Sequence, residues 1–314
     1  MGGEGTGEGM TAFRPGLVHA PVTPFKPDRS VDYETYAKLI EFHLKNGAEA
    51  LALPMPEGED LSLTDAEQRK VIEFAINQVK GRAPVIAHTS DAGTMIAVDR
   101  ARFAEKAGAA AIVTHPPYFW HPRPAMVVEH VAAVGSATKL PVFVCTPPVE
   151  NVGTHLTADI FMQIVDRLPN LRGVVDAEMD FVFMEEIMAN RKARRADYDL
   201  ISGADYMVSP AACGGHGAFS SLAAIAPKLV KQVYDLCEKQ DFIEARKGQE
   251  HLAVLRQLVK QPRLETGLKA ALRAMGRDCG QPRPPSRPLG EVEHGAVAEA
   301  IAAMPALRAE PRGW

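Results

Sequence analysis

The strongest constraint on the fold is an alternation that runs through most of the chain. Short apolar runs rich in β-branched residues are each followed by an amphipathic stretch typical of a helix. The apolar runs lie at 16–25, 48–55, 83–90, 110–119, 140–148, 171–177, 198–205 and 214–221. The helical stretches lie at 32–47, 63–81, 95–109, 125–139, 157–170, 181–196, 206–214 and 225–240. Strict alternation predicts a parallel sheet, and eight such units predict an α/β fold of the closed (β/α)8 barrel type, a TIM barrel.

Local signals support these boundaries and extend the prediction beyond the barrel. Gly47 is placed to end the first helix, and Thr64 with Glu67 has the spacing of a capping box. Two further helical patterns follow the eighth unit and predict a C-terminal helical extension packed on the barrel. The predicted organisation is a disordered leader at 1–12, a barrel at 13–235 and the extension at 236–314. The Pro-rich stretch 281–291 is interpreted as an extended surface strip inside that extension.

Composition narrows the classes of partner. A net charge of −4 and a pI near 6.2 give no electrostatic reason to expect nucleic acid or an anionic membrane surface. No apolar run reaches the roughly 18 residues that span a bilayer, and the Gly-rich opening lacks the pattern of a secretory signal. The cysteines are far apart in sequence, which predicts reduced thiols rather than a disulfide framework or zinc site. We expect a cytoplasmic protein with a small-molecule ligand.

The reacting groups of a barrel of this kind sit at the C-terminal ends of its strands. The stretch "LRGVVDAEMD" is informative here, because a buried run ends at Val175 and opens directly onto carboxylates. The residues to weigh at the predicted strand ends are Thr23, Glu57, Glu59, His88, Asp91, His115, Tyr118, Cys145, Asp176, Glu178, Asp205 and Ser220.

At these positions the sequence resembles a known family, the dihydrodipicolinate synthase and N-acetylneuraminate lyase superfamily of class I aldolases with a (β/α)8 fold. The resemblance covers almost the whole chain and rests on the order and spacing of several short motifs. They are "APVTPF" at 20–25, the Gly-Glu pair at 58–59, "PPYF" at 116–119, "SGAD" at 202–205, "GGHGAFSSLAAIAP" at 214–227 and "GLKAALRAMG" at 267–276.

The resemblance implies a lysine at the end of the sixth strand, within a Gly-hydrophobic-Lys-Asp/Glu context. In that family the lysine amine forms a Schiff base with a 2-oxo acid, usually pyruvate, and the protonated imine is the electron sink. Here Gly173 and Asp176 match the context, and the lysine position is Val175. An isopropyl group cannot attack a carbonyl, so the family's imine chemistry is not expected from this strand. Lys45, Lys80, Lys106 and Lys139 fall in predicted helices or at their ends, and Lys269 falls in the C-terminal helices.

Other positions implied by the resemblance also differ. Cys145 stands where the family has a proton-relaying tyrosine. Pro56 and Glu57 stand where a hydroxyl pair binds the substrate carboxylate, and the arginine after the fifth strand corresponds to Glu150. Phe119 replaces the second tyrosine of the family's Pro-Tyr-Tyr motif. A mouth that gains carboxylates is expected to repel a 2-oxo acid.

These comparisons give two groups of candidate residues. Acid/base groups, or ligands of a divalent metal, are predicted at Glu57, His88, Asp176, Glu178 and Asp205. Substrate contacts are predicted at Pro56, Tyr118, Cys145, Val175 and Ser220. In both groups, a structural role is the alternative to a functional role. His88 could fill the space left by the missing lysine, Asp176 could anchor a loop, and Cys145, Tyr118 and Ser220 could be inherited scaffold. His115 is expected to pack and His121 to be exposed.

Three interpretations therefore remain open. The first is a lyase, hydratase or aldolase-like enzyme on a small carbonyl compound, using acid/base or metal-assisted chemistry without an imine. The second is a non-catalytic relative that binds a small molecule, that is, a pseudoenzyme. The third is a conventional pyruvate-dependent aldolase, for which the alignment that puts Val175 at the lysine position would be wrong. No organic cofactor is expected, and a divalent metal is possible. The resemblance implies a homo-oligomer, a dimer or a tetramer.

Overall fold

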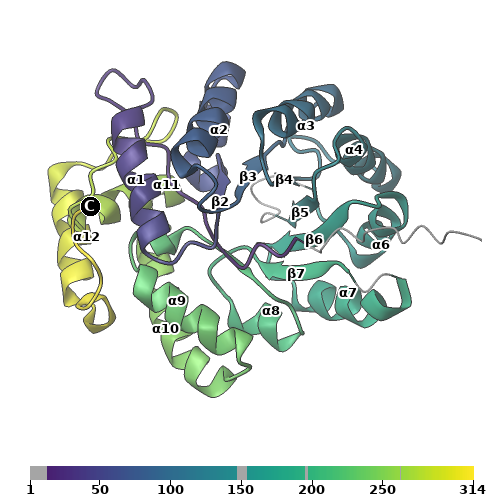
Figure 1. The fold of residues 1–314 in the computed structure, drawn as a ribbon. Coiled ribbons are helices and arrows are strands. Elements are labelled where there is room, and N and C mark those ends of the chain that lie inside the picture. The colour runs from purple at the N-terminus through teal and green to yellow at the C-terminus, as the bar shows by residue number, and fades with distance from the viewer. Residues whose placement is uncertain (1–12, 147–153, 195–196, 262) are drawn as a thin grey trace, which may run out of the picture.

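The computed structural model describes residues 13–146, 154–194, 197–261 and 263–314, and it contains the predicted barrel. Eight parallel strands close in sequence order, with β1 paired to β8. Figure 1 shows the strands at the centre of a ring of helices. The strands are β1 Leu17–His19, β2 Ala50–Leu53, β3 Val85–His88, β4 Ala111–Thr114, β5 Val142–Thr146, β6 Leu171–Asp176, β7 Asp199–Ser202 and β8 Ala218–Ser220. The predicted leader at 1–12 lies outside the described residues.

The helices follow the strands as the alternation predicts. The ring consists of α1 Tyr33–Lys45, α2 Asp65–Val79, α3 Thr94–Ala107, α4 Pro124–Ser136, α6 Ala158–Arg167, α7 Phe181–Arg194, α8 Val208–Ala212 and α9 Pro227–Glu238. Short 3₁₀ turns complete the connections: η1 Pro56–Gly58, η2 Asp60–Ser62, η3 Leu222–Ala224 and η4 Pro305–Leu307. The capping box is confirmed, because the Thr64 hydroxyl accepts from the Glu67 backbone N–H and the Glu67 carboxylate accepts from the Thr64 backbone N–H.

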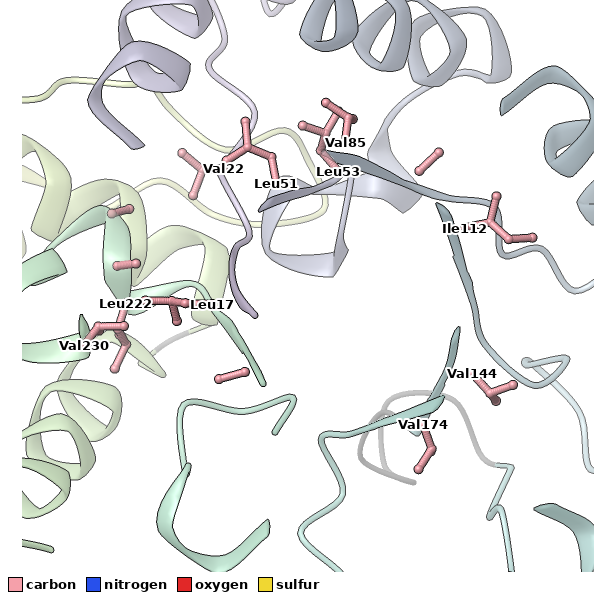
Figure 2. Packing of buried hydrophobic residues seen from close by; sticks show 14 of the residues in the cluster. Leu17, Val22, Leu51, Leu53, Val85, Ile112, Val144, Val174, Leu222 and Val230 are labelled. Carbon is pink, nitrogen blue, oxygen red and sulfur yellow. The ribbon is translucent and has the colours of Figure 1, made fainter. Parts of the chain in front are cut away.

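Side chains alternate between the two faces of each strand, and this alternation decides which residues can reach the barrel interior. Val85 and Ala87 of β3 pack outward against the helices, whereas Ile86 faces inward. Val144 and Val174 likewise lie on the outer faces of β5 and β6, as Figure 2 shows. The outer layer forms the larger of two hydrophobic cores, and it holds the helices on the barrel.

The second core fills the barrel itself. Its members are Val18, Ala20, Ala50, Ala52, Met55, Ile86, Ala111, Val113, Phe143, Cys145, Val175, Ile201 and Phe219, with Phe13 packed against them. The small side chains of Ala50, Ala52 and Ala111 pack in one cluster with large ones such as Phe143 and Phe219, so the interior is solid rather than a channel.

Three helices follow the barrel in the C-terminal extension, one more than the two that the sequence predicted. They are α10 Phe242–Val259, α11 Leu264–Ala274 and α12 Glu291–Ala303. Helix α10 packs on α9, and α11 packs on α10, on α12 and on η1 after strand β2. In Figure 1 α11 and α12 lie beside α1, on the outer side of the ring. The contact with η1 brings this extension to the C-terminal mouth of the barrel. The Pro-rich stretch is less superficial than expected, since Pro282, Ser286 and Leu289 are buried.

Candidate functional site

The barrel mouth has an apolar floor. Val175 is the inward-facing residue at the end of β6, and it is 1% exposed between Cys145 of β5 and Ile201 of β7. By the same alternation, His88 follows Ile86 and His115 follows Val113, so both imidazoles face the interior. Asp176 and Ser220 have the opposite parity and face the helix layer. The alternation therefore separates the candidate residues into an interior set and an outer set.

The eight described strands contain no lysine. The buried lysine nearest to the mouth in the fold is Lys269 of α11, and its amine is already engaged. Its Nζ lies 2.6 Å from Glu59 Oε1, with both side chains 2% exposed, and 4.1 Å from the centre of the Phe25 ring. Burial lowers the pKa of Lys269, and the Glu59 carboxylate opposes that effect.

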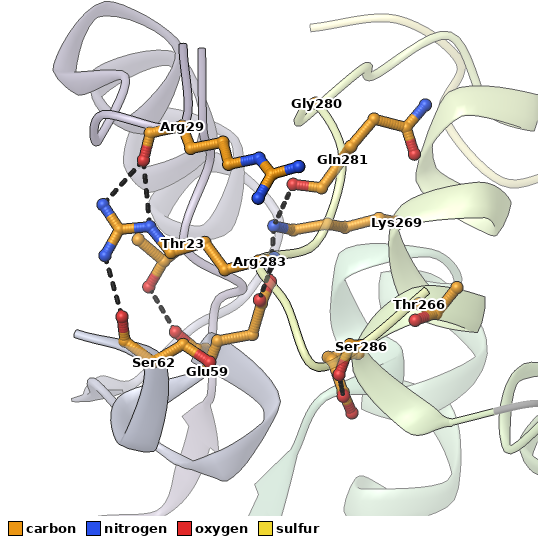
Figure 3. A network of polar contacts seen from close by, with 12 residues as sticks. Thr23, Arg29, Glu59, Ser62, Thr266, Lys269, Gly280, Gln281, Arg283 and Ser286 are labelled. Atoms are coloured by element: carbon orange, nitrogen blue, oxygen red, sulfur yellow. Dashed lines mark hydrogen bonds and ion pairs between the residues drawn. The ribbon is translucent and has the colours of Figure 1, made fainter. Parts of the chain in front are cut away.

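Glu59 and Lys269 belong to a seam that joins the loop after β2 to the C-terminal extension (Figure 3). The second oxygen of Glu59 accepts from the Arg283 backbone N–H at 2.8 Å. The Arg283 guanidinium donates to the Ser62 and Arg29 carbonyls and pairs with Glu67 at 2.6 Å. Each charged group in the seam has a partner. The seam therefore holds the C-terminal extension on the loop after β2 and carries no free reactive group.

Glu57 differs from Glu59 although only one residue separates them. It lies on η1, and its side chain is partly exposed to solvent. Among the described residues its carboxylate forms no ion pair and no hydrogen bond with another side chain. Burial raises the pKa of Glu57; the charges of Asp205 and Glu265 add to that effect, and Arg256 opposes it. Pro56, the preceding residue, is exposed.

Asp60 is a site residue that the sequence did not single out. It begins η2, directly after Glu59, whose φ of 60° makes the sharp turn that sends the two side chains in different directions. The Asp60 side chain is buried, with Oδ2 3.5 Å from Nδ1 of His88. Burial raises the pKa of Asp60 to about 7; Glu57 adds to the effect and Arg100 opposes it. A carboxylic acid that titrates near neutral pH thus stands beside a buried histidine.

His88 and His115 pack against each other edge to face, with ring centres 4.8 Å apart. Burial lowers the pKa of His115 to about 4 and holds that of His88 well below its usual range, where His115 and Arg100 lower it further. Both rings are therefore neutral at physiological pH. Neither ring nitrogen of His88 has a hydrogen-bond partner among the described residues. His121 is exposed, as expected.

Asp176 and Glu178 serve the loops around the mouth. The Thr146 hydroxyl donates to Asp176 Oδ1 at 2.7 Å, and the Met179 N–H donates to Oδ2 at 3.1 Å. Burial raises the pKa of Asp176 to about 6, while the Thr146 hydroxyl opposes that shift. Glu178 contacts His155 Nδ1 at 2.7 Å, a partner that sequence reasoning missed. Asp176 is an anchor between β5 and β6, and Glu178 lies on the partly exposed rim.

Asp205 is placed in the middle of a bonding network. Its carboxylate accepts from the Ser220 hydroxyl, from the Ser221 hydroxyl at 3.2 Å, and from Arg256 at 3.1 Å. Its own carbonyl accepts from Gln249 at 2.7 Å. Asp205 and Ser220 thus tie β7, β8 and α10 together, and no carboxylate oxygen is left without a donor. Arg256 was not foreseen, because its helix lies far along the chain from the strands it supports.

Cys145 and Tyr118 complete the described part of the mouth. Cys145 is buried, and burial, followed by the charges of Glu57 and Asp176, raises the pKa of its thiol well above the usual range. It is therefore a thiol rather than a thiolate nucleophile. Tyr118 is half-buried, with its pKa raised to about 12 by burial and by the nearby Asp91 and Asp60. Phe119 is 94% exposed, and Glu150 lies outside the described residues.

Within the described ranges no three His, Cys, Asp or Glu side chains are grouped so that they could hold a metal ion. Two cavities of about 490 and 670 Å³ lie on the outer helices, the first between α6 and α7 and the second between α1 and α9. Neither is lined by a candidate residue of the mouth. Of the described helices, none combines the length and apolar character that crossing a membrane requires.

Comparison with known proteins decides the family. A profile of the dihydrodipicolinate synthetase family matches residues 14–304. The chain belongs to that family. It is 32% identical over 295 residues to the 4-hydroxy-tetrahydrodipicolinate synthase of Rhodopseudomonas palustris, covering 92% of this chain and 97% of the relative. The corresponding enzyme of Bacillus subtilis is 29% identical over 287 residues, covering 91% and 97%.

Solved structures of the family agree with the fold. A dihydrodipicolinate synthase from Thermotoga maritima superposes with a TM-score of 0.86 at 25% identity, covering 95% of this chain and 100% of that one. A second from Aquifex aeolicus gives a TM-score of 0.85 at 26% identity, covering 92% and 97%. The closed barrel with its C-terminal helices is thus the fold of this family.

Proposed function

We propose that this member of the dihydrodipicolinate synthetase family is a lyase that acts on a small carbonyl compound by proton transfer, without a covalent imine. The observation that carries the proposal is Glu57, an unpaired and partly exposed carboxyl group with a raised pKa, at the mouth of a barrel whose sixth strand ends in Val175. The relatives are named as 4-hydroxy-tetrahydrodipicolinate synthases, and the Schiff base of that family needs an amine where this chain has an isopropyl group.

Proton transfer needs an acid that is protonated at working pH and close to the carbonyl oxygen. Burial favours the protonated form of Glu57 by raising its pKa, and among the described residues no other side chain binds its carboxyl group. In the proposed step a base removes a proton from the carbon beside the carbonyl while Glu57 protonates the oxygen, giving an enol. For carbon–oxygen cleavage, the enol returns its O–H proton to Glu57 and expels a β-hydroxyl group, which leaves as water with the proton held by the base. For carbon–carbon cleavage, the base instead removes the proton of a β-hydroxyl group, and the bond breaks to give a second carbonyl compound and the enol whose oxygen Glu57 protonates.

The carboxyl groups around the mouth also limit the substrate. An ionised Asp60 opposes a second negative charge, so we propose a substrate without a carboxylate beside its carbonyl. The reaction needs no organic cofactor. A divalent metal is the other way to polarise the carbonyl, and proton exchange that persists in the presence of EDTA supports the metal-free version. We propose a homo-oligomer, a dimer or a tetramer, although one family member is described as a monomeric variant.

Deuterium exchange tests the proposal without knowledge of the true substrate. The protein is incubated in D₂O with hydroxyacetone, a neutral ketone, or with pyruvate, and loss of the α-proton signals is followed by NMR. We expect catalysed exchange of hydroxyacetone that exceeds that of pyruvate and falls about 100-fold in Glu57→Gln. Glu73→Gln, which changes an exposed carboxylate of α2, is the matched control and keeps the rate. An equal rate in Glu57→Gln contradicts the proposal.

A second candidate function, a non-catalytic small-molecule binder, is favoured by one observation. His88, His115, Cys145 and Val175 are each less than 5% exposed, so the interior end of the mouth is well filled. A thermal-shift screen separates the two functions. A ligand at 100 times its Kd stabilises the protein by about 2.7 kcal/mol, and stabilisation without α-proton exchange supports the binder.

A further inference from the structure

The Asp60–His88 contact joins residues from two neighbouring strand ends. His88 is the last residue of β3, and Asp60 lies in the connection that follows β2. The position of Asp60 is fixed from both sides: Glu59 is held by Lys269 and Arg283, and the Asp60 carbonyl accepts from Gln68 at 2.9 Å. The 3.5 Å between Asp60 Oδ2 and His88 Nδ1 is long for a hydrogen bond, yet a shift of a few tenths of an ångström makes one.

His88 itself is unusual among buried polar groups. Its side chain has 0% exposure, and neither ring nitrogen has a hydrogen-bond partner among the described residues. Most buried polar groups are paired, and the polar groups beside this ring include the Asp60 carboxyl group and the Pro54 carbonyl. Nδ1 faces the Asp60 carboxyl group, and Nε2 is the second ring nitrogen, enclosed in the barrel interior.

Two proton arrangements are possible for this pair, and they give opposite properties to Nε2. When Asp60 is a carboxylate, it accepts Nδ1–H, and Nε2 carries a free lone pair. When Asp60 is a carboxylic acid, its O–H donates to Nδ1, and the single ring proton must sit on Nε2. The imidazole is neutral in both arrangements. Acidification therefore adds one proton to Asp60 and moves the ring proton from one nitrogen to the other.

We propose that Asp60 is a positioning residue that sets the tautomer of His88, and that His88 is the base of the mouth only when Asp60 is ionised. The inference rests on the proposed function for the role of His88 as a base, but the tautomer switch itself is independent of any substrate. Its substrate class is a carbonyl compound that presents an acidic C–H to Nε2, while Glu57 protonates the carbonyl oxygen.

The surroundings are consistent with titration of Asp60 rather than of the ring. Glu57 from η1, Arg100 from α3 and Tyr118 from the loop after β4 face Asp60, and His115, Arg100 and the Pro54 carbonyl face His88. Burial, followed by Glu57, raises the pKa of Asp60 to about 7, whereas the pKa of His88 is held well below its usual range. The switch is therefore expected close to pH 7.

Nitrogen NMR of the ¹⁵N-histidine-labelled protein tests the switch directly. The His88 signals are assigned by their loss in His88→Gln, and the one-proton tautomer is determined from the two ring-nitrogen shifts between pH 5.5 and 8.5. We expect the Nδ1–H form at high pH, the Nε2–H form at low pH, and a midpoint near 7. An Asp60→Asn variant should lose the pH dependence, and Asp60→Glu should restore it with a shifted midpoint.

Asp99→Asn is the matched control, since it removes an exposed carboxylate of α3 and should leave the tautomer curve unchanged. A His88 tautomer that does not vary with pH in the wild-type protein overturns the proposal, and this result does not depend on the Asp60 variants. A tautomer switch without α-proton exchange leaves the positioning role of Asp60 standing and refutes the role of His88 as a base. If exchange occurs, its rate should rise about 10-fold per pH unit below the midpoint and level off above it.

Discussion

The seam and the mouth of this barrel both contain acidic residues, but the acids of the two regions differ in their partners and in their roles. In the seam, Glu59 is 5% exposed and each of its oxygens is bonded, one to Lys269 and the other to the Arg283 N–H. At the mouth, within the described ranges, Glu57 has no ion pair and no side-chain hydrogen bond, and Asp60 has backbone donors and a long contact with His88. All three acids lie within four consecutive positions of one connection.

The difference teaches that burial alone does not identify a functional carboxylate. The donors around Glu59 make it part of the fastening between the loop and the extension, whereas Asp60 has no side-chain donor at hydrogen-bond distance among the described residues, has a raised pKa and can exchange a proton. The sharp turn at Glu59 is what divides the connection into these two parts. The two regions should therefore respond differently to substitution and to pH.

The largest effect is expected from Lys269→Met in the seam. Removing the amine leaves Glu59 as a buried, unpaired charge, and the free energy of unfolding should fall by about 3–5 kcal/mol. Urea denaturation at pH 7 measures it. The double variant Glu59→Gln/Lys269→Met should recover part of the loss, and Lys247→Ala on the exposed face of α10 should change little. A loss below about 1 kcal/mol would show that the seam does not fasten the extension.

The next effect concerns the pH dependence of stability through Asp60. Its pKa is raised from 3.8 to about 7 in the folded protein, so the folded state holds a proton that the unfolded state releases between these values. Its contribution to stability is complete below pH 4 and is lost as the pH rises to about 7. Asp60→Asn should therefore stabilise the protein at pH 8 relative to pH 4, on the order of 2–4 kcal/mol. Parallel unfolding curves of the two proteins across this range would contradict the raised pKa.

A smaller effect is expected from Glu57→Gln. The substitution removes an acid whose charged form is disfavoured by burial, and it breaks no ion pair. Stability at pH 7 should stay the same or rise by up to about 1 kcal/mol. Thermal unfolding of the variant beside the wild-type protein measures this. A loss of more than about 1 kcal/mol would mean that Glu57 has a structural partner and stabilises the fold, as Glu59 does.

The smallest effect is expected at the rim, where His155 pairs with Glu178. His155 is 43% exposed, and such pairs contribute little because water screens them. His155→Ala should change the free energy of unfolding by less than about 0.5 kcal/mol. Urea denaturation at low and high salt measures this effect. A loss well above that value would show that the His155–Glu178 pair stabilises the fold as the ion pairs of the seam do.

Sequence reasoning reached the fold because each local signal pointed to the same architecture. The apolar runs, the capping box at Thr64 and Glu67, and the eight-fold alternation all have local causes, and the structure confirms them. Strand periodicity also accounts for the inward direction of Cys145 and Val175.

The site could be predicted only in part, because its contacts join distant segments. Asp60 meets His88 across two strand ends, and Arg256 reaches Asp205 from a helix 51 positions away. No local pattern marks either contact. The sequence likewise could not show that Asp205 is bonded through both oxygens while Glu57 is unpaired, since that distinction depends on which donors the fold brings near.

Reductive trapping tests the central claim most directly. The protein and the Bacillus subtilis relative are each incubated with pyruvate and sodium borohydride, digested, and analysed by mass spectrometry. We expect a pyruvyl-lysine adduct in the relative and an unmodified chain here, because Val175 cannot form the imine and Lys269 is engaged with Glu59. A stoichiometric pyruvyl adduct on any lysine of this chain would contradict the account.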